Sequence, residues 1–255
     1  MIRFNRPAIV GREFEYLTDA ATIGHLSSSG PYSTRCSELL KTSLGAPDVL
    51  LTTSCTDALE MTALMMDLGP GDTVIVPSYT FTSTALAFAR QGVNLRFADI
   101  EPVRLGIDPA GVEALIDETV RAVVCVHYGG IPCDIDGLID VLARYPDIAL
   151  IEDNAHGLFG THEGRQLGTF GRFATLSFHE TKNFHCGEGG ALIVNDPSDI
   201  GRAHVLFDKG TNRRAFMLGE VDKYTWIDTG SSFGMSELQG AFLCAQLEQA
   251  DAVLA

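Results

Sequence analysis

The amino-acid sequence predicts an α/β fold in which helices cover both faces of a mainly parallel, mixed sheet. Short apolar runs alternate with helical patterns along most of the chain, an order that is typical of βαβ units. The runs are apolar throughout, as expected for strands that are buried on both faces. With 255 residues, of which 45% are hydrophobic, the chain is long enough to bury one large core.

Glycine and proline bound the first two strand–helix pairs. Residues 48–54 (DVLLTTS) are predicted to form a strand, and the helix over 56–68 stops at the sequence GPGD. Residues 73–78 (TVIVPS) form the next predicted strand. The helix over 82–92 ends at Gly92, because glycine tolerates the left-handed conformation that closes many helices.

Two further pairs and a fifth strand follow. Residues 94–100 are a predicted strand, and the helix over 108–117 begins with an aspartate cap and a proline in its first turn. A predicted strand over 121–130 precedes a helix over 135–146. Residues 148–155 (IALIEDNA) form the fifth strand.

The pattern then changes. Residues 173–179 and 189–195 are short predicted strands on either side of Lys182, which suggests a hairpin or an antiparallel edge. A helix is expected over 197–207. Residues 231–255 form a long helical pattern that runs to the last residue without a stop signal.

Composition excludes several classes of partner. The net charge of −15 argues against a nucleic-acid backbone, which needs a basic face. No apolar run reaches the ~18 residues of a membrane-spanning helix, and the N-terminal residues lack the apolar core of a secretion signal. The six cysteines form no C-x-x-C pair, so reduced thiols and a cytoplasmic location are expected. One basic cluster, Lys209, Arg213 and Arg214, is a solvated loop or an anion contact.

Polar or aromatic residues follow four of the predicted strands. In open parallel sheets, ligands bind at the carboxyl ends of the strands, so these residues are expected to share one site. They are 54–57, 78–81, His127 with Tyr128, and 153–156.

The segment TTSCTDALE reads as an anion site at a helix start. Free N–H groups and the helix dipole would point at one spot near Thr56. Simple capping of the helix by Ser54 or Thr56 would account for the same sequence pattern. No G-x-G-x-x-G or G-x-x-x-x-G-K-[ST] motif occurs at a strand–helix junction, which argues against a dinucleotide or nucleoside triphosphate.

The segment LIEDNAHG places two carboxylates at the end of a buried strand. Alternation sends only one of Glu152 and Asp153 toward a given face. Such a carboxylate either forms a structural ion pair or keeps the nitrogen of a heterocycle protonated.

Lys182 precedes a run of glycines and is either a solvated turn residue or a reactive amine. The glycines at 187, 189 and 190 would let the backbone approach a bound ligand closely. Ser177 lies five residues before the lysine, within reach of an anion. A zinc site of the H-E-x-x-H type starting at His179 fails because Asn183 takes the place of the second histidine, and no metal is expected. An anion cradle, a buried acid, an aromatic residue (Tyr79 or Phe81) and a lysine are together what pyridoxal phosphate requires.

The motifs and their order resemble the sugar-nucleotide aminotransferases of the DegT/DnrJ type, within the fold type I pyridoxal phosphate enzymes. The resemblance covers nearly the whole chain through TTSCTDALEM, VHYGG, IEDNAHG, LSFHETKN, GEGGAL, KGTNR and DKYTWIDTGSS. It implies an aspartate aminotransferase-like large domain over residues 1–230. Residues 231–255 would begin a helix leading to a small C-terminal domain that is absent here, so that the chain would be truncated.

The resemblance also implies roles for individual residues. Lys182 resembles the Schiff-base lysine and Asp153 the partner of the pyridine nitrogen. His156 would lie near the ring hydroxyl and Phe81 would stack on the ring. The phosphate would be bound by Cys55, Thr56 and Ser177, and the diphosphate of the substrate by Lys209, Arg213 and Arg214.

The implied reaction transfers an amino group from L-glutamate to a nucleotide-linked keto-sugar. The expected acceptor is dTDP-4-keto-6-deoxyglucose, which would give dTDP-4-amino-4,6-dideoxygalactose for a surface polysaccharide, and a homodimer with shared sites is expected. Three alternatives remain open at this point: amination of a 3-keto-sugar, dehydration of a sugar by the same fold, and an inactive fragment that only binds the cofactor.

Overall fold

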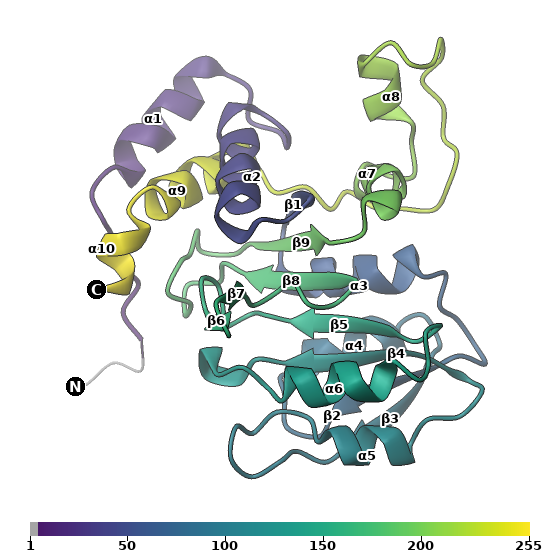
Figure 1. Ribbon diagram of the computed structural model, residues 1–255. Helices are drawn as coiled ribbons and strands as arrows, with labels where there is room; N and C mark the ends of the chain where they lie inside the picture. The colour runs from purple at the N-terminus through teal and green to yellow at the C-terminus, as the bar shows by residue number, and fades with distance from the viewer. Residues whose placement is uncertain (1–4) are drawn as a thin grey trace.

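The computed structural model describes residues 5–255 as a three-layer α/β/α sandwich (Figure 1). Residues 1–4 of the predicted large domain lie outside the described residues. The central layer is a seven-stranded sheet with the strand order β1-β9-β8-β5-β4-β2-β3. A separate two-stranded ribbon, β6 (Thr161–His162) with β7 (Arg165–Gln166), follows β5.

Six of the seven strands of the large sheet run in one direction and β9 runs against them. β9 pairs antiparallel with both β1 and β8, whereas the other neighbouring strands pair in parallel. The carboxyl ends of the six parallel strands therefore meet at one edge of the sheet. The strands are β1 (Asp48–Thr52), β2 (Thr73–Pro77), β3 (Asn94–Ala98), β4 (Val120–Val126), β5 (Ala149–Asp153), β8 (Phe173–Ser177) and β9 (Gly190–Val194).

The predicted mainly parallel sheet is confirmed, with one difference in its order. The hairpin of β8 and β9 is present, but it does not form the edge of the sheet, because β1 pairs with β9 on the outside. Every residue of β9 is buried, as an interior strand requires. Sequence patterns alone do not tell which buried strand lies at an edge.

Helices cover both faces of the sheet. One apolar core forms between the sheet and α3, α4 and α7. On the other face, α5 and α6 cover one half of the sheet, while α2 and α9 cover the half formed by β1, β9 and β8. The helices are α1 (Glu13–Ile23), α2 (Pro31–Leu44), α3 (Cys55–Met65), α4 (Thr82–Ala89), α5 (Pro109–Ala114), α6 (Ile135–Leu142), α7 (Ile200–Phe207), α8 (Arg213–Met217), α9 (Glu237–Leu247) and α10 (Ala250–Leu254), with short 3₁₀ turns at Tyr128–Gly130 and Pro197–Asp199.

Side-chain caps fix where several helices begin. Ser54 accepts the Asp57 N–H at the start of α3, so capping by Ser54 is confirmed. Asp108 caps α5, as predicted. Ser236 caps α9, and Gln239 completes a capping box there.

The prediction of one long helix over residues 231–255 is wrong. Residues before Ser236 are extended and bridge to the body of the sheet, with Gly234 opposite Thr52 and Ser232 opposite Asp208. The Thr53 N–H donates to the Phe233 carbonyl at 2.9 Å. This backbone pairing competes with helix formation, and the helical stretch that remains divides into α9 and α10.

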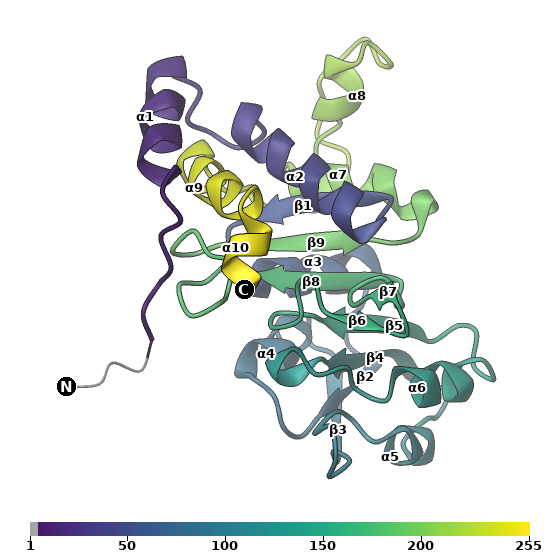
Figure 2. The ribbon, with the colours of Figure 1, turned by 60° about the vertical axis from the view of Figure 1, so that its left-hand side comes forward.

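Two parts of the chain lie outside the predicted strand–helix alternation. The helices α1 and α2 share one apolar core with α9 and with β1, β8 and β9. An arm formed by α8 and the residues after it projects away from the sheet in both views (Figures 1 and 2). Among residues 5–255, no helix combines the length and the apolar character needed to cross a bilayer.

Candidate active site

A cavity of about 420 Å³ opens at the carboxyl edge of the sheet, beside the ends of β4, β5 and β8. It collects side chains from segments that are far apart in the sequence, including three that the sequence predicted to act together: His156, Ser177 and Lys182. The complete lining is Tyr128, Gly129, Ala155, His156, Leu158, Ser177, Thr181, Lys182, Asn183 and Phe184.

Lys182 lies in the connection between β8 and β9. Antiparallel pairing continues beyond both strands, since the Phe178 N–H donates to the Gly189 carbonyl at 2.7 Å and the Glu180 N–H to the Gly187 carbonyl at 2.8 Å. Phe184 is buried in the core and anchors the far side of the connection. Lys182 is thus held over the cavity by a rigid support.

The amine of Lys182 is half-buried, and this burial lowers its pKa below the usual value. The nearby Asp153 carboxylate opposes the shift. A lysine with a lowered pKa has a larger neutral fraction, and the neutral amine is the nucleophile and the base. Its surroundings therefore favour a reactive amine over a solvated turn residue.

Asp153 ends β5 and is 5% exposed. One carboxylate oxygen accepts a 2.7 Å hydrogen bond from the Thr84 hydroxyl, and the other accepts the Ala155 N–H at 3.2 Å. No cation pairs with it among the described residues, and the Lys182 and His156 side chains both feel its charge. The carboxylate is thus oriented by neutral donors and left with its charge available to a ligand.

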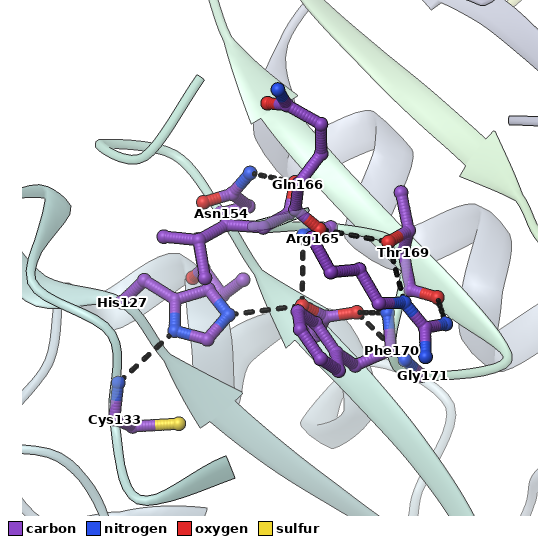
Figure 3. Close-up of polar contacts among 12 residues, drawn as sticks. His127, Cys133, Asn154, Arg165, Gln166, Thr169, Phe170 and Gly171 are labelled. Atoms are coloured by element: carbon purple, nitrogen blue, oxygen red, sulfur yellow. Dashed lines mark hydrogen bonds and ion pairs between the residues drawn. The ribbon is translucent and has the colours of Figure 1, made fainter. Parts of the chain in front are cut away.

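Glu152, the preceding residue, points to the opposite face and has a structural role. Its carboxylate is fully buried and accepts the N–H groups of Gly168 at 2.8 Å and of Phe170 and Gly171 at 2.7 Å. His127 donates to it as well, at 3.0 Å (Figure 3). The two interpretations of this acidic pair thus apply to different members: Glu152 is structural, and Asp153 lies close enough to Lys182 for its charge to act on the amine, although it does not line the cavity.

His127 follows β4 but does not line the cavity. Its Nδ1 accepts the Cys133 N–H at 3.2 Å, so its proton lies on Nε2, toward Glu152 (Figure 3). Cys125, His127 and Cys133 bring two sulfurs and one nitrogen within 4.8 Å of one another, all buried. Because both ring nitrogens are hydrogen-bonded, this cluster is a satisfied part of the core.

The start of α3 offers unpaired donors next to the site. Among the described residues, no protein acceptor takes the N–H groups of Cys55 and Thr56, which head the helix. The Thr56 hydroxyl donates to Ser83 at 2.7 Å and thereby ties this helix start to that of α4. The Cys55 thiol is protonated, because burial raises its pKa. It donates to the Thr175 hydroxyl at 3.5 Å.

Gly190 allows this helix start to approach β9. A Cβ on Gly190 would lie 2.3 Å from the Cys55 amide nitrogen, so only glycine fits. Gly189 is similarly crowded by the Cys186 sulfur, and Gly187 adopts a φ of +87° in the turn. The glycines after Lys182 are therefore required by the packing of the protein on itself, which sequence reasoning had attributed to a ligand.

His156 lies at the rim of the cavity with its Nδ1 accepting the Gly129 N–H at 3.0 Å. The proton of the neutral ring is therefore on Nε2, which leaves a donor for a ligand. Partial desolvation lowers the pKa of His156, and the charge of Lys182 adds to this effect. The edge of the ring packs on Tyr128, with 5.2 Å between the centroids.

Phe81 heads α4 with a ring that is 73% exposed, and it does not line the cavity. The rings of Tyr128 and Phe184 line the cavity, and Tyr79 packs against Tyr128 at a centroid distance of 4.5 Å. The stacking role of Phe81 stays a prediction.

The three predicted substrate cations lie elsewhere in the chain. Arg213 and Arg214 line a second cavity of about 410 Å³, between α2, β1, α7 and α8. Asp208 pairs with Lys209 at 2.8 Å and with Arg213 at 3.3 Å. None of the three lines the Lys182 cavity. Their assignment to the substrate stays a prediction.

Sequence reasoning missed three polar residues of the site. Thr84 holds the Asp153 carboxylate, and Thr181 and Asn183 line the cavity beside Lys182. The last two flank the lysine in the motif HETKN, which could have identified them. Nothing in the sequence links Thr84 to a carboxylate 69 positions away.

Comparison with known proteins identifies the relatives of this fold and site. Residues 7–255 match the sequence profile described as the DegT/DnrJ/EryC1/StrS aminotransferase family. The chain belongs to this family. The predicted fold type I architecture is thereby confirmed, and the cavity around Lys182 is the candidate active site of a DegT/DnrJ/EryC1/StrS family member.

Individual relatives are moderately similar. The spore coat polysaccharide biosynthesis protein SpsC of Bacillus subtilis is 32% identical over 251 residues, which are 97% of this chain and 64% of that protein. GDP-perosamine synthase of Caulobacter vibrioides is 31% identical over 98% of this chain and 65% of its own length. The solved sugar aminotransferase CalS13 of Micromonospora echinospora is 25% identical, with a TM-score of 0.89 over 99% of this chain and 69% of its own. This family member thus spans about two-thirds of the length of its relatives.

Proposed function

We propose that this chain is, or forms part of, a pyridoxal phosphate-dependent aminotransferase that moves an amino group from L-glutamate to a nucleotide-linked keto-sugar. One observation carries the proposal. A lysine whose pKa is lowered by burial lines the same cavity as His156 and Ser177. The carboxylate of Asp153, which accepts a hydrogen bond from the neutral Thr84 hydroxyl, is close enough for its charge to act on this lysine. Membership of an aminotransferase family supports it.

The residues present fit the cofactor. The free N–H groups at the start of α3 and the Ser177 hydroxyl would bind its phosphate. Asp153 has no cation of its own among the described residues and would bind the protonated ring nitrogen. The Nε2–H of His156 would donate to the ring hydroxyl.

When bound, pyridoxal phosphate supplies a ring that accepts electrons from a carbanion at the amino-acid carbon. Lys182 would hold the cofactor through its amine and, once released, move a proton as general base. Burial of the amine serves both roles because it increases the neutral fraction. Thr84 and the Ala155 N–H keep the Asp153 carboxylate in one orientation.

For the acceptor we propose dTDP-4-keto-6-deoxyglucose, with dTDP-4-amino-4,6-dideoxygalactose as the product. The motifs SFHETKN, KGTNR and DKYTWIDTGSS support this choice, and the relatives named for perosamine and spore-coat polysaccharide synthesis support amination of a sugar. Lys209, Arg213 and Arg214 are the proposed contacts for the diphosphate. The cysteines, all free thiols, fit the proposed cytoplasmic location.

We also propose a homodimer with shared sites. The arm after α7 exposes several large apolar side chains that the chain itself does not cover, and such a surface is typical of an interface. The most exposed are Met217 at 73%, Leu218 at 62% and Trp226 at 75%. A second copy could cover the arm and bring its basic residues to the partner's cavity.

The test begins with the purified protein and added pyridoxal phosphate. A visible absorption band should form and shift on addition of glutamate, and ¹⁵N-labelled glutamate should transfer nitrogen to a keto-sugar nucleotide chosen from a panel of 3-keto and 4-keto sugars. Loss of water without transfer would indicate a dehydratase, and a band without turnover would indicate a fragment that only binds the cofactor.

The matched variants are Lys182→Ala and Lys41→Ala. Lys41 pairs with Glu38 at 2.9 Å on α2, outside the cavity. We expect the first variant to lose the band and the activity, and the second to keep the band. Turnover by the Lys182→Ala protein would rule out the proposed function.

A further inference from the structure

His179 organises the turn that carries Lys182. Its Nδ1 accepts the Thr181 N–H at 3.2 Å and the Thr181 hydroxyl at 2.9 Å. Its own carbonyl accepts the Lys182 N–H at 2.9 Å. The residue immediately before Lys182 and the backbone of Lys182 itself are thus both hydrogen-bonded to His179.

We propose that His179 is a positioning residue for Lys182, and that it holds the turn only while its imidazole is neutral. This inference rests on the proposed function, because it concerns how the amine is aimed into the same cavity. A neutral ring with its proton on Nε2 accepts both bonds from Thr181 through one lone pair. A proton on Nδ1 removes that lone pair, so the Thr181 N–H loses its acceptor, while the Thr181 hydroxyl can turn and accept from the new Nδ1–H.

The geometry resembles a backbone turn that is closed by a side chain. Asparagine and aspartate close such turns by accepting the N–H two residues ahead, which is the contact that His179 makes with Thr181. An asparagine at position 179 would reproduce the acceptor, but it would not titrate. Comparing the wild type with this variant therefore separates the effect of having an acceptor at position 179 from the effect of protonating it.

Two charged groups lie near His179. Glu188, from the other side of the connection, places a carboxylate oxygen 3.5 Å from Nε2, and Lys182 follows three residues later in the chain. Of the other segments that touch this turn, α9 holds the Glu188 carbonyl through the neutral Gln239, and the N-terminal segment holds the Glu180 carbonyl through the neutral Asn5. The turn is therefore expected to loosen when a proton on Nδ1 takes the acceptor away from the Thr181 N–H.

The test compares the wild-type protein with His179→Asn and His179→Ala, all free of cofactor. The first measurement is the rate at which Lys182 captures added pyridoxal phosphate, trapped with borohydride and located by peptide mass. The second is the rate at which acetic anhydride acylates Lys182, which does not depend on the cofactor. The other three lysines, at 41, 209 and 223, serve as internal standards.

The ratio of the wild-type rate to the His179→Asn rate cancels the titration of the lysine amine. We expect the ratio for capture to lie near one at pH 8 and to fall about tenfold by pH 5.5, because protonation of the ring removes one hydrogen bond from the turn. His179→Ala should be about tenfold slower than His179→Asn at pH 8.

A ratio that stays constant from pH 8 to 5.5, in capture and in acylation alike, would overturn the inference. Equal rates for His179→Ala and His179→Asn would also overturn it. If the alanine variant does not fold, the asparagine variant and the pH profile still decide. If Lys182 of the wild type captures the cofactor but the ratio stays constant, only the role of His179 is refuted. If Lys182 does not capture the cofactor at all, the proposed function is refuted.

Discussion

Glu152 and Asp153 are neighbours on one strand, both are buried carboxylates, and the protein uses them in opposite ways. Glu152 accepts four hydrogen bonds from groups of the protein and has no capacity left for a ligand. Asp153 accepts two, from Thr84 and from the Ala155 N–H, and its charge acts on Lys182 although it does not line the cavity. The number and charge of the partners, and not burial, distinguish a structural carboxylate from one that is available for chemistry.

The comparison also shows how the site is kept rigid. The partners of Glu152 come from the loop before β8 and from the residue after β4, so that one carboxylate fastens two segments to β5. Because Asp153 is the next residue of β5, the contacts that hold Glu152 in place also hold the backbone of Asp153. Changes at the two positions should therefore separate stability from activity.

The largest effect is expected for Glu152→Gln. The amide has one oxygen, so its NH₂ group would face buried N–H donors, and breaking a buried charged network typically costs about 3–5 kcal/mol. Urea unfolding of this variant should show a loss of that size in the free energy of unfolding. Glu118→Gln, at an exposed glutamate, is the matched control and should change it by less than about 0.5 kcal/mol. A loss of less than about 1 kcal/mol at Glu152 would contradict the structural role.

Asp153→Asn should show the opposite profile. The amide oxygen can still accept a hydrogen bond from Thr84 or Ala155, so the free energy of unfolding should change by about 1 kcal/mol or less. Turnover with glutamate and the keto-sugar nucleotide should fall by about 10²–10³-fold, because the charge that stabilises the ring nitrogen is removed. Full activity of this variant would refute the assignment of Asp153 to the cofactor.

A smaller effect on activity is expected for Thr84→Val. It removes the 2.7 Å hydrogen bond that orients Asp153 while nearly keeping the side-chain volume. A lost hydrogen bond to a charged group is worth about 1.5–3 kcal/mol, so kcat/KM should fall by about tenfold or more. Thr84→Ser keeps the hydroxyl and should restore most of the activity. Equal kinetics for the valine and serine variants would show that Thr84 does not act through its hydroxyl.

The smallest effect is a shift in the titration of Lys182 in the cofactor-free protein. Burial lowers the pKa of this amine and the Asp153 carboxylate raises it, so removing the carboxylate should lower it further. The pH dependence of acylation by acetic anhydride, followed for each lysine by mass spectrometry, measures the shift. Asp153→Asn should acylate Lys182 at lower pH than the wild type, with the other lysines unchanged. A shift to higher pH would contradict the proximity of the two groups.

Much of the fold could be read from local patterns. The four strand–helix units and the fifth strand between residues 48 and 155 are set by apolar runs and by the residues that bound them. The same holds for the hairpin around Lys182 and for the caps at Ser54 and Asp108. The last 25 residues were misread, because backbone pairing of Gly234 with Thr52 is a long-range contact that a helical pattern does not reveal.

The candidate site was predicted less completely. His156, Ser177 and Lys182 are motif residues, and the structure brings them to one cavity. Phe81 and the cations of the arm do not reach that cavity within one chain. The purpose of the glycines after Lys182 was misjudged as well, since steric crowding by Cys55 cannot be seen before the segments are packed.

The sequence by itself determined which residues are candidates for chemistry: a lysine before glycines, two acids at a strand end and a helix start with free N–H groups. Only the tertiary structure decided which of these groups the protein itself hydrogen-bonds fully and which it leaves available. Strand alternation requires that Glu152 and Asp153 face opposite ways, but it does not say which of them meets the loop that supplies three N–H groups and which lies near Lys182. That choice depends on contacts between segments far apart in the chain, and those contacts exist only after the sheet has formed.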